Sequence, residues 1–209
     1  MGPLSDPPAT ALSVAPAVRM LLRGPLRAGA ALGRGHVLFG HYVVSVTAPG
    51  APRMPNGIEV ELGGAEPGAA ASVGEGVLRV GDLAAGEGPL WEPRPSVSIP
   101  FGPPGPAPDV MALAGLGPGL TPEGDDLIAG YAAGLALFHG RSEEASALAE
   151  AAALRTTSLS ATLLRHAAAG ELAEPAHEFL AGRGEAALLR WGSSSGRKLL
   201  EGLRLAGAR

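Results

Sequence analysis

The first half of the chain has the hydrophobic pattern of short strands. Residues 58–62 alternate apolar and acidic side chains, which is the period-two pattern of a strand with one buried face. The β-branched and aromatic run at 37–46 predicts one or two more strands, and 76–81 and 96–99 are shorter candidates. Because glycine and proline turns separate these segments, the pattern predicts a small barrel or sandwich.

The second half has the spacing of helices. Apolar residues recur every three or four positions in 121–139, where they form a stripe for packing: Leu127, Tyr131, Leu135 and Phe138. Strands followed by helices predict an α+β fold. Further helices are expected at 142–156, 158–169, 174–181, 185–191 and 194–205, and a short one, interrupted at Gly24-Pro25, is expected within 16–32.

These patterns divide the chain into four parts. We expect a disordered start at 1–15, a β-rich part at 16–100, a proline-rich connector at 101–109 and a helical part at 110–209 that carries a glycine-rich loop. A length of 209 residues suits one large domain or two small ones.

Composition narrows the classes of protein to consider. The net charge of −4 offers no basic field for nucleic acid, so no nucleic-acid partner is expected. The absence of cysteine excludes disulfides, thiolate metal sites and cysteine nucleophiles. We find no pattern of a signal peptide or of a membrane span, so a cytoplasmic protein without membrane contact is expected.

The loop at 115–126, Gly-Leu-Gly-Pro-Gly-Leu-Thr-Pro-Glu-Gly-Asp-Asp, is the main candidate for chemistry. Thr121 and Pro122 are typical of a helix N-cap and first turn, where free N–H groups suit an anion. Three carboxylates, Glu123, Asp125 and Asp126, oppose a bare anion, so a phosphate would need a metal or an arginine such as Arg165 or Arg197. The alternative is a plain tight turn, whose carboxylates are near the helix N-terminus because the helix dipole stabilises negative charge there.

Two later blocks are weaker candidates. The segment 156–160, Thr-Thr-Ser-Leu-Ser, has more hydroxyls than one helix cap requires. The segment 192–196, Gly-Ser-Ser-Ser-Gly, is either a flexible cap or an anion-binding turn. Gly130 and Gly134 favour close approach of another backbone, and a ligand on that face is the alternative.

These three blocks together resemble the AllH-like family. The run 117–126 resembles the family signature Gly-Pro-Gly-Leu-Thr-Pro-Ser-Gly-Asp-Asp, and 156–160 and 192–196 resemble the second and third blocks in order and spacing. The resemblance covers 113–205 and differs at Glu123 and at Arg197-Lys198. It implies a subunit of an oxamate carbamoyltransferase of allantoin breakdown that acts with larger partner subunits, without assigning the chemistry to this chain.

We therefore expect the three blocks to meet at one site for a small carbamoyl, amide or phosphate ligand. Asp125 or Asp126 would orient an N–H group or bind a hydrated Mg²⁺. Two alternatives stay open: a non-catalytic subunit whose loop docks larger partners, and a stand-alone transferase. No catalytic residue is assigned, and the expected ligand-binding residues are Gly117, Gly119, Thr121, Gly124, Asp125, Asp126, Ser160, Ser194, Ser195 and Gly196.

Overall fold

The computed structural model describes residues 8–33, 35–61 and 66–209, and the chain divides into two compact units. The first unit, Met1–Glu92, contains the strands, and the second, Pro93–Arg209, contains helices α2 to α8. Strands followed by helices are the α+β organisation predicted from the sequence. Residues 1–7 of the expected disordered start lie outside the described residues, whereas two short strands already lie within 9–14.

The described strands of the first unit form one nine-stranded sheet in the order β1-β9-β8-β7-β3-β4-β5-β6-β2. Neighbouring strands are antiparallel except for the β1–β9 and β5–β6 pairs, which are parallel. The predicted strands at 37–46, 58–62 and 76–81 correspond to β4 and β5, β6, and β8. The strands are β1 (Ala9–Thr10), β2 (Ser13–Val14), β3 (Arg27–Gly33), β4 (His36–Phe39), β5 (Tyr42–Thr47), β6 (Gly57–Glu59), β7 (Ala70–Gly74), β8 (Val77–Val80) and β9 (Leu83–Gly86).

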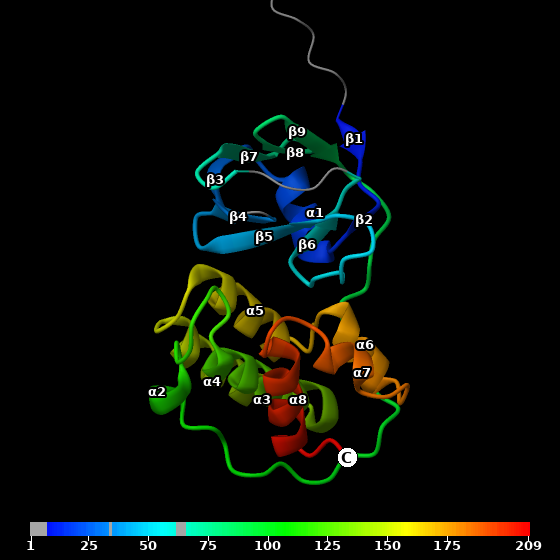
Figure 1. Ribbon diagram of the computed structural model, residues 1–209, viewed down its shortest axis with the longest axis vertical. Coiled ribbons are helices and arrows are strands. Elements are labelled where there is room, and N and C mark those ends of the chain that lie inside the picture. Colours follow the sequence, from blue (N-terminus) through cyan, green and yellow to red (C-terminus); the bar gives the residue numbers. More distant parts are fainter. Residues whose placement is uncertain (1–7, 34, 62–65) are drawn as a thin grey trace, which may run out of the picture. The chain divides into compact units, whose positions relative to one another are not determined.

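The first two strands reach both edges of this sheet. β1 pairs with β9 at one edge, and β2, two residues further along the chain, pairs with β6 at the other. The Val14 N–H also donates to the Pro89 carbonyl (2.9 Å), and the Trp91 N–H donates to the Val14 carbonyl (3.0 Å). Because one short segment joins both edges, the sheet curls on itself into a half-barrel (Figure 1).

Helix α1 (Pro16–Arg23) contributes to the core of this unit. Its Val18 and Leu22 are fully buried in the same cluster as apolar residues of the strands, and the helix contacts β7 and β8. Pro16 lies in the first turn, where proline is tolerated. The helix ends at Gly24, which is extended, because a residue before proline disfavours the helical region.

Two predictions about secondary structure are wrong. The short helix expected within 16–32, interrupted at Gly24-Pro25, is found only before the interruption, as Pro16–Arg23, and Arg27–Gly33 instead forms β3 between β4 and β7. Within β3, a Cβ on Gly29 would lie 2.4 Å from the Phe39 ring, so the neighbouring strand requires a glycine there. The strand expected at 96–99 is irregular, because the Ser98 N–H donates to the Leu180 carbonyl (2.7 Å) rather than to a strand.

The second unit is built around α3, which contacts α2, α4, α5 and α8. The predicted helices of this half are confirmed, with ends that differ by a few residues. The helices are α2 (Val110–Leu113), α3 (Glu123–His139), α4 (Ser142–Ala153), α5 (Ser158–Ala168), α6 (Glu174–Leu180), α7 (Ala186–Leu189) and α8 (Ser195–Leu205).

Helices α3 and α8 touch through their backbones. A Cβ on Gly130 would lie 2.1 Å from the Leu199 carbonyl oxygen, and a Cβ on Gly202 would lie 2.1 Å from the Leu127 carbonyl oxygen. Gly134 faces Ala206 in the same way, at 2.3 Å from its Cβ. The glycines therefore serve close helix packing, the favoured interpretation of their spacing.

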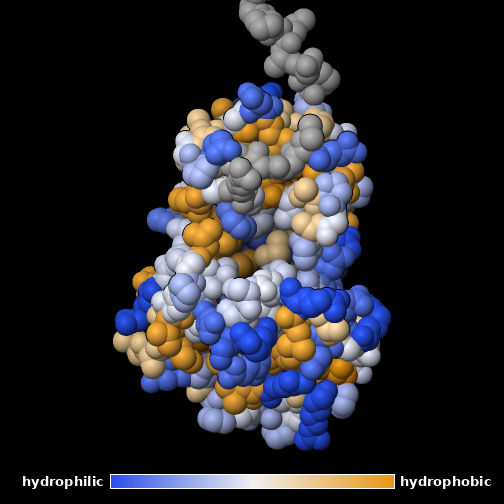
Figure 2. Space-filling view, in the orientation of Figure 1, coloured by the Kyte–Doolittle hydropathy of each residue, from blue (hydrophilic) through white to orange (hydrophobic). Residues whose placement is uncertain are grey.

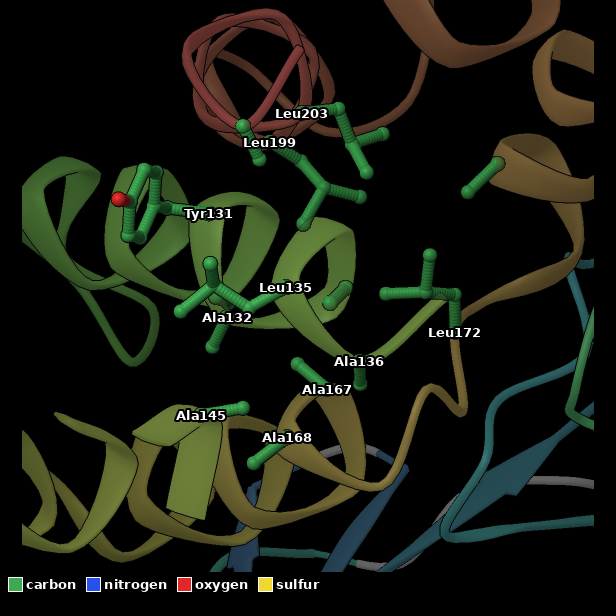
Figure 3. Close-up of a cluster of buried hydrophobic side chains, with 14 of the residues drawn as sticks. Tyr131, Ala132, Leu135, Ala136, Ala145, Ala167, Ala168, Leu172, Leu199 and Leu203 are labelled. Carbon is green, nitrogen blue, oxygen red and sulfur yellow. The ribbon is translucent and has the colours of Figure 1, made fainter. Parts of the chain in front are cut away.

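The core of the helical unit lies on both sides of α3. Figure 3 shows Leu199 and Leu203 of α8 on one side of α3 and Ala145, Ala167 and Ala168 on the other. Alanine side chains let α4 and α5 lie close to α3, which compensates for the low aromatic content of 4%.

The surface of the helical unit exposes several large apolar side chains. Met111, Leu116, Leu120 and Leu154 are 67%, 58%, 44% and 86% exposed, and Leu116 and Leu120 belong to the glycine-rich loop. Figure 2 shows hydrophilic and hydrophobic residues mixed over the visible face. None of the helices in the described residues is both long and apolar enough to cross a membrane.

The α3–α8 contact yields a test. Gly202→Ala should lower the free energy of unfolding by about 2 kcal/mol or more, because the added methyl group meets backbone atoms that cannot move aside cheaply. Urea unfolding followed by circular dichroism would measure this. Ser146→Ala, at an exposed position of α4, is the control and should stay within about 0.5 kcal/mol of the wild type.

Candidate functional site

The carboxylate of Asp125 ties three segments together. Its Oδ1 accepts a hydrogen bond from the Gly115 N–H (2.8 Å), and its Oδ2 accepts one from the Thr156 hydroxyl. The side chain lies in the first turn of α3 and is 2% exposed. Asp125 therefore fixes the start of the glycine-rich loop and the segment before α5, and both of its oxygens are in use.

The adjacent Asp126 is in a different position. It is 7% exposed, and its Oδ2 has no hydrogen-bond partner among the described residues. Burial raises the pKa of Asp126 to about 7, the hydrogen bond from the Ser195 hydroxyl opposes this shift, and the charges of Asp125 and Glu123 add to it. A buried acceptor without a partner is costly, and such groups cluster at functional sites.

Thr121 contacts the third block rather than capping α3. Its hydroxyl lies 3.2 Å from the hydroxyl of Ser195, the first residue of α8. The N-cap of α3 is Pro122, which has no capping side chain, so the prediction that Thr121 caps this helix is wrong. The Ser195 hydroxyl is thus a neighbour of both Thr121 and Asp126.

The hydroxyls of the second block bind the end of the loop. Thr157 donates to the Leu120 carbonyl (2.5 Å), and Ser160 lies 3.5 Å from the same oxygen. Thr157 also caps α5 by accepting from the Ser160 N–H (3.1 Å). One residue therefore supplies the cap, and the other hydroxyls hold the loop.

Two of the four predicted site glycines have packing roles. A Cβ on Gly124 would lie 2.0 Å from the Leu113 carbonyl oxygen, and a Cβ on Gly196 would lie 1.7 Å from the Leu188 carbonyl oxygen. These residues let α3 approach α2, and α8 approach α7.

The other two site glycines and Ser194 line the two turns. Gly117 has a φ of 122° and leaves room beside the Glu123 N–H, since a Cβ there would lie 2.9 Å from that nitrogen. Gly119 has a φ of 90° and open space around it. Ser194 is the N-cap of α8, but its side chain makes no capping hydrogen bond.

The structure brings residues of all three predicted blocks into contact. Sequence reasoning missed Thr156 and Thr157 as individual residues, although the excess of hydroxyls in 156–160 was the signal that pointed to them. Of the two arginines named for a phosphate, Arg165 is paired with Glu150 (2.7 Å), whereas Arg197, near the start of α8, is exposed. Among the described residues, no group of three or more histidines and acids is arranged to hold a metal ion.

The role of Asp125 can be tested by Asp125→Ala. The change leaves the Gly115 N–H and the Thr156 hydroxyl without their acceptor, so the free energy of unfolding should fall by about 2 to 3 kcal/mol. Chemical unfolding measures the loss. A change below about 0.5 kcal/mol would contradict this structural role.

Asp126→Asn should stabilise the protein in a pH-dependent way. A carboxyl whose folded pKa is raised from 3.8 to about 7 lowers stability as the pH rises through this interval. The variant should therefore gain up to about 4 kcal/mol over the wild type at about pH 8 and little at about pH 4. Urea unfolding across this pH range measures the difference, and Ser146→Ala, which changes no titratable group at an exposed position of α4, should show no such trend.

Comparison with known protein families finds a match in the segment that carries this site. The family described as "Oxamate carbamoyltransferase subunit AllH" matches residues 113–207, which contain the glycine-rich loop and both later blocks. Neither the curated proteins nor the solved structures contain a match to the chain. The first unit lies outside the matched residues. The segment 113–207, with all three motifs, is therefore similar to the AllH family.

Proposed function

We propose that this chain is a subunit of an oxamate carbamoyltransferase-like complex and that the junction of the three blocks binds a small carbamoyl or amide ligand. The family description supports the role of a subunit and implies partner subunits. The observation that carries the ligand is the unpaired, buried Oδ2 of Asp126. An amide or carbamoyl NH₂ group donates hydrogen bonds and would supply the partner that this oxygen lacks.

The local charges favour such a ligand over phosphate or Mg²⁺. Phosphate would be repelled by Glu123, Asp125 and Asp126, and Arg165 already binds Glu150. A hydrated Mg²⁺ prefers one or two carboxylates, but both oxygens of Asp125 already accept hydrogen bonds. A neutral N–H donor needs only the one oxygen of Asp126 that is unpaired.

Thermal-shift measurements with oxamate, carbamoyl phosphate, phosphate and MgCl₂ test this proposal. A ligand that binds only the folded chain raises the melting temperature, and the shift increases with the ratio of ligand concentration to Kd. Oxamate, through its amide N–H groups, should stabilise the wild type and Glu143→Gln but not Asp126→Ala. Equal shifts in Asp126→Ala and the wild type would overturn the assignment to Asp126.

A docking role for the loop is the second candidate, and the exposure of its leucines favours it. Leu116 and Leu120 are 58% and 44% exposed on a loop whose backbone is held from both ends. In this case Leu116→Ser with Leu120→Ser would abolish co-purification with co-expressed larger subunits. The same variant would keep any stabilisation by oxamate, which separates docking from ligand binding.

A further inference from the structure

The unpaired oxygen of Asp126 is buried, so a ligand reaches it only if its surroundings move. Asp126 lies one turn before Gly130, on the face of α3 that packs against α8. The residues that meet beside it are Thr121, at the end of the glycine-rich loop, and Ser195, at the start of α8. The movement must therefore separate two segments that lie 74 positions apart in the sequence.

We propose that the Thr121 and Ser195 hydroxyls form a latch that closes the Asp126 site and opens to admit the ligand. The two oxygens lie 3.2 Å apart, and this contact joins the loop to α8. The Ser195 hydroxyl is also a neighbour of the Asp126 carboxyl group, so the latch joins the loop to α8 beside the residue with the unpaired oxygen. This inference rests on the proposed function, since it concerns access to the same site.

Both sides of the latch adjoin a turn that can move. Residues 117–119, Gly-Pro-Gly, make no hydrogen bond within the described part of the chain, and both glycines have positive φ. On the α8 side, Gly192 also has positive φ, Ser193 is exposed and the Ser194 side chain makes no capping bond. Glycine at such positions tolerates changes of backbone angle that other residues resist.

The rest of the junction is anchored, which confines the movement. On the loop side, the Gly115 N–H is held by Asp125, and the Gly124 N–H donates to the Leu116 carbonyl (3.0 Å). On the α8 side, the Gly196 N–H donates to the Trp191 carbonyl (3.1 Å). Opening therefore breaks hydroxyl contacts, such as the long one of 3.5 Å between Ser160 and Leu120, and loosens only the first turns of α3 and α8.

Hydrogen exchange of the chain without ligand tests the latch directly. Thr121→Val keeps the shape of the side chain but removes its hydroxyl, whereas Thr121→Ser keeps the hydroxyl. The Asp126 and Lys198 amides, which bond to the Pro122 and Ser194 carbonyls, should exchange about fivefold faster in Thr121→Val and at the wild-type rate in Thr121→Ser. Equal exchange in all three proteins would overturn the latch.

An engineered disulfide provides a second test, because the chain has no cysteine of its own. Thr121→Cys with Ser195→Cys places two thiols where the hydroxyls are in contact. Oxidation should slow association of oxamate at least tenfold relative to the reduced form of the same protein, and a reductant should restore it. Equal association rates in the two forms would overturn the latch. If no form binds oxamate, the proposed function fails, and hydrogen exchange still decides the latch.

Discussion

The contact of the α3 and α8 backbones at Gly130 and Gly202 determines the geometry of the helical unit. Residues one or two turns earlier lie on the same helix faces. Asp126 is one turn before Gly130, and Ser195 is two turns before Gly202, so the contact also places these two side chains together. A larger side chain at either glycine would move the helices apart, and the junction of the three blocks would separate with them.

Two neighbouring aspartates have opposite roles because of this packing. Asp125 faces the loop, and each of its carboxyl oxygens accepts a hydrogen bond. Asp126 faces α8, and its Oδ2 has no hydrogen-bond donor among the described residues. A fold that keeps a buried carboxyl with an unpaired oxygen gives up stability at neutral pH. Such a cost is typical of positions kept for binding rather than for folding.

The sequence predicts the helical unit better than the sheet. Apolar residues at helical spacing define α3 to α8, and local spacing is sufficient for that purpose. The strand β3 is rich in alanine and glycine, and only its pairing with β4 and β7 makes it extended. In the site, the motifs predicted which blocks would meet, and the structure brings them into contact. The motifs did not predict that Asp125 is the aspartate with a hydrogen-bond donor for each oxygen, because its partners Gly115 and Thr156 are positioned by tertiary packing.

The way the half-barrel closes has a consequence for the order of folding. β1 and β2 precede every other described strand in the sequence, yet they pair with β9 and β6. During synthesis, β1 must therefore wait for about seventy further residues before its partner emerges from the ribosome. Pairings between distant segments are slow to form, so closure of the sheet should be a late and rate-limiting step of this unit's folding.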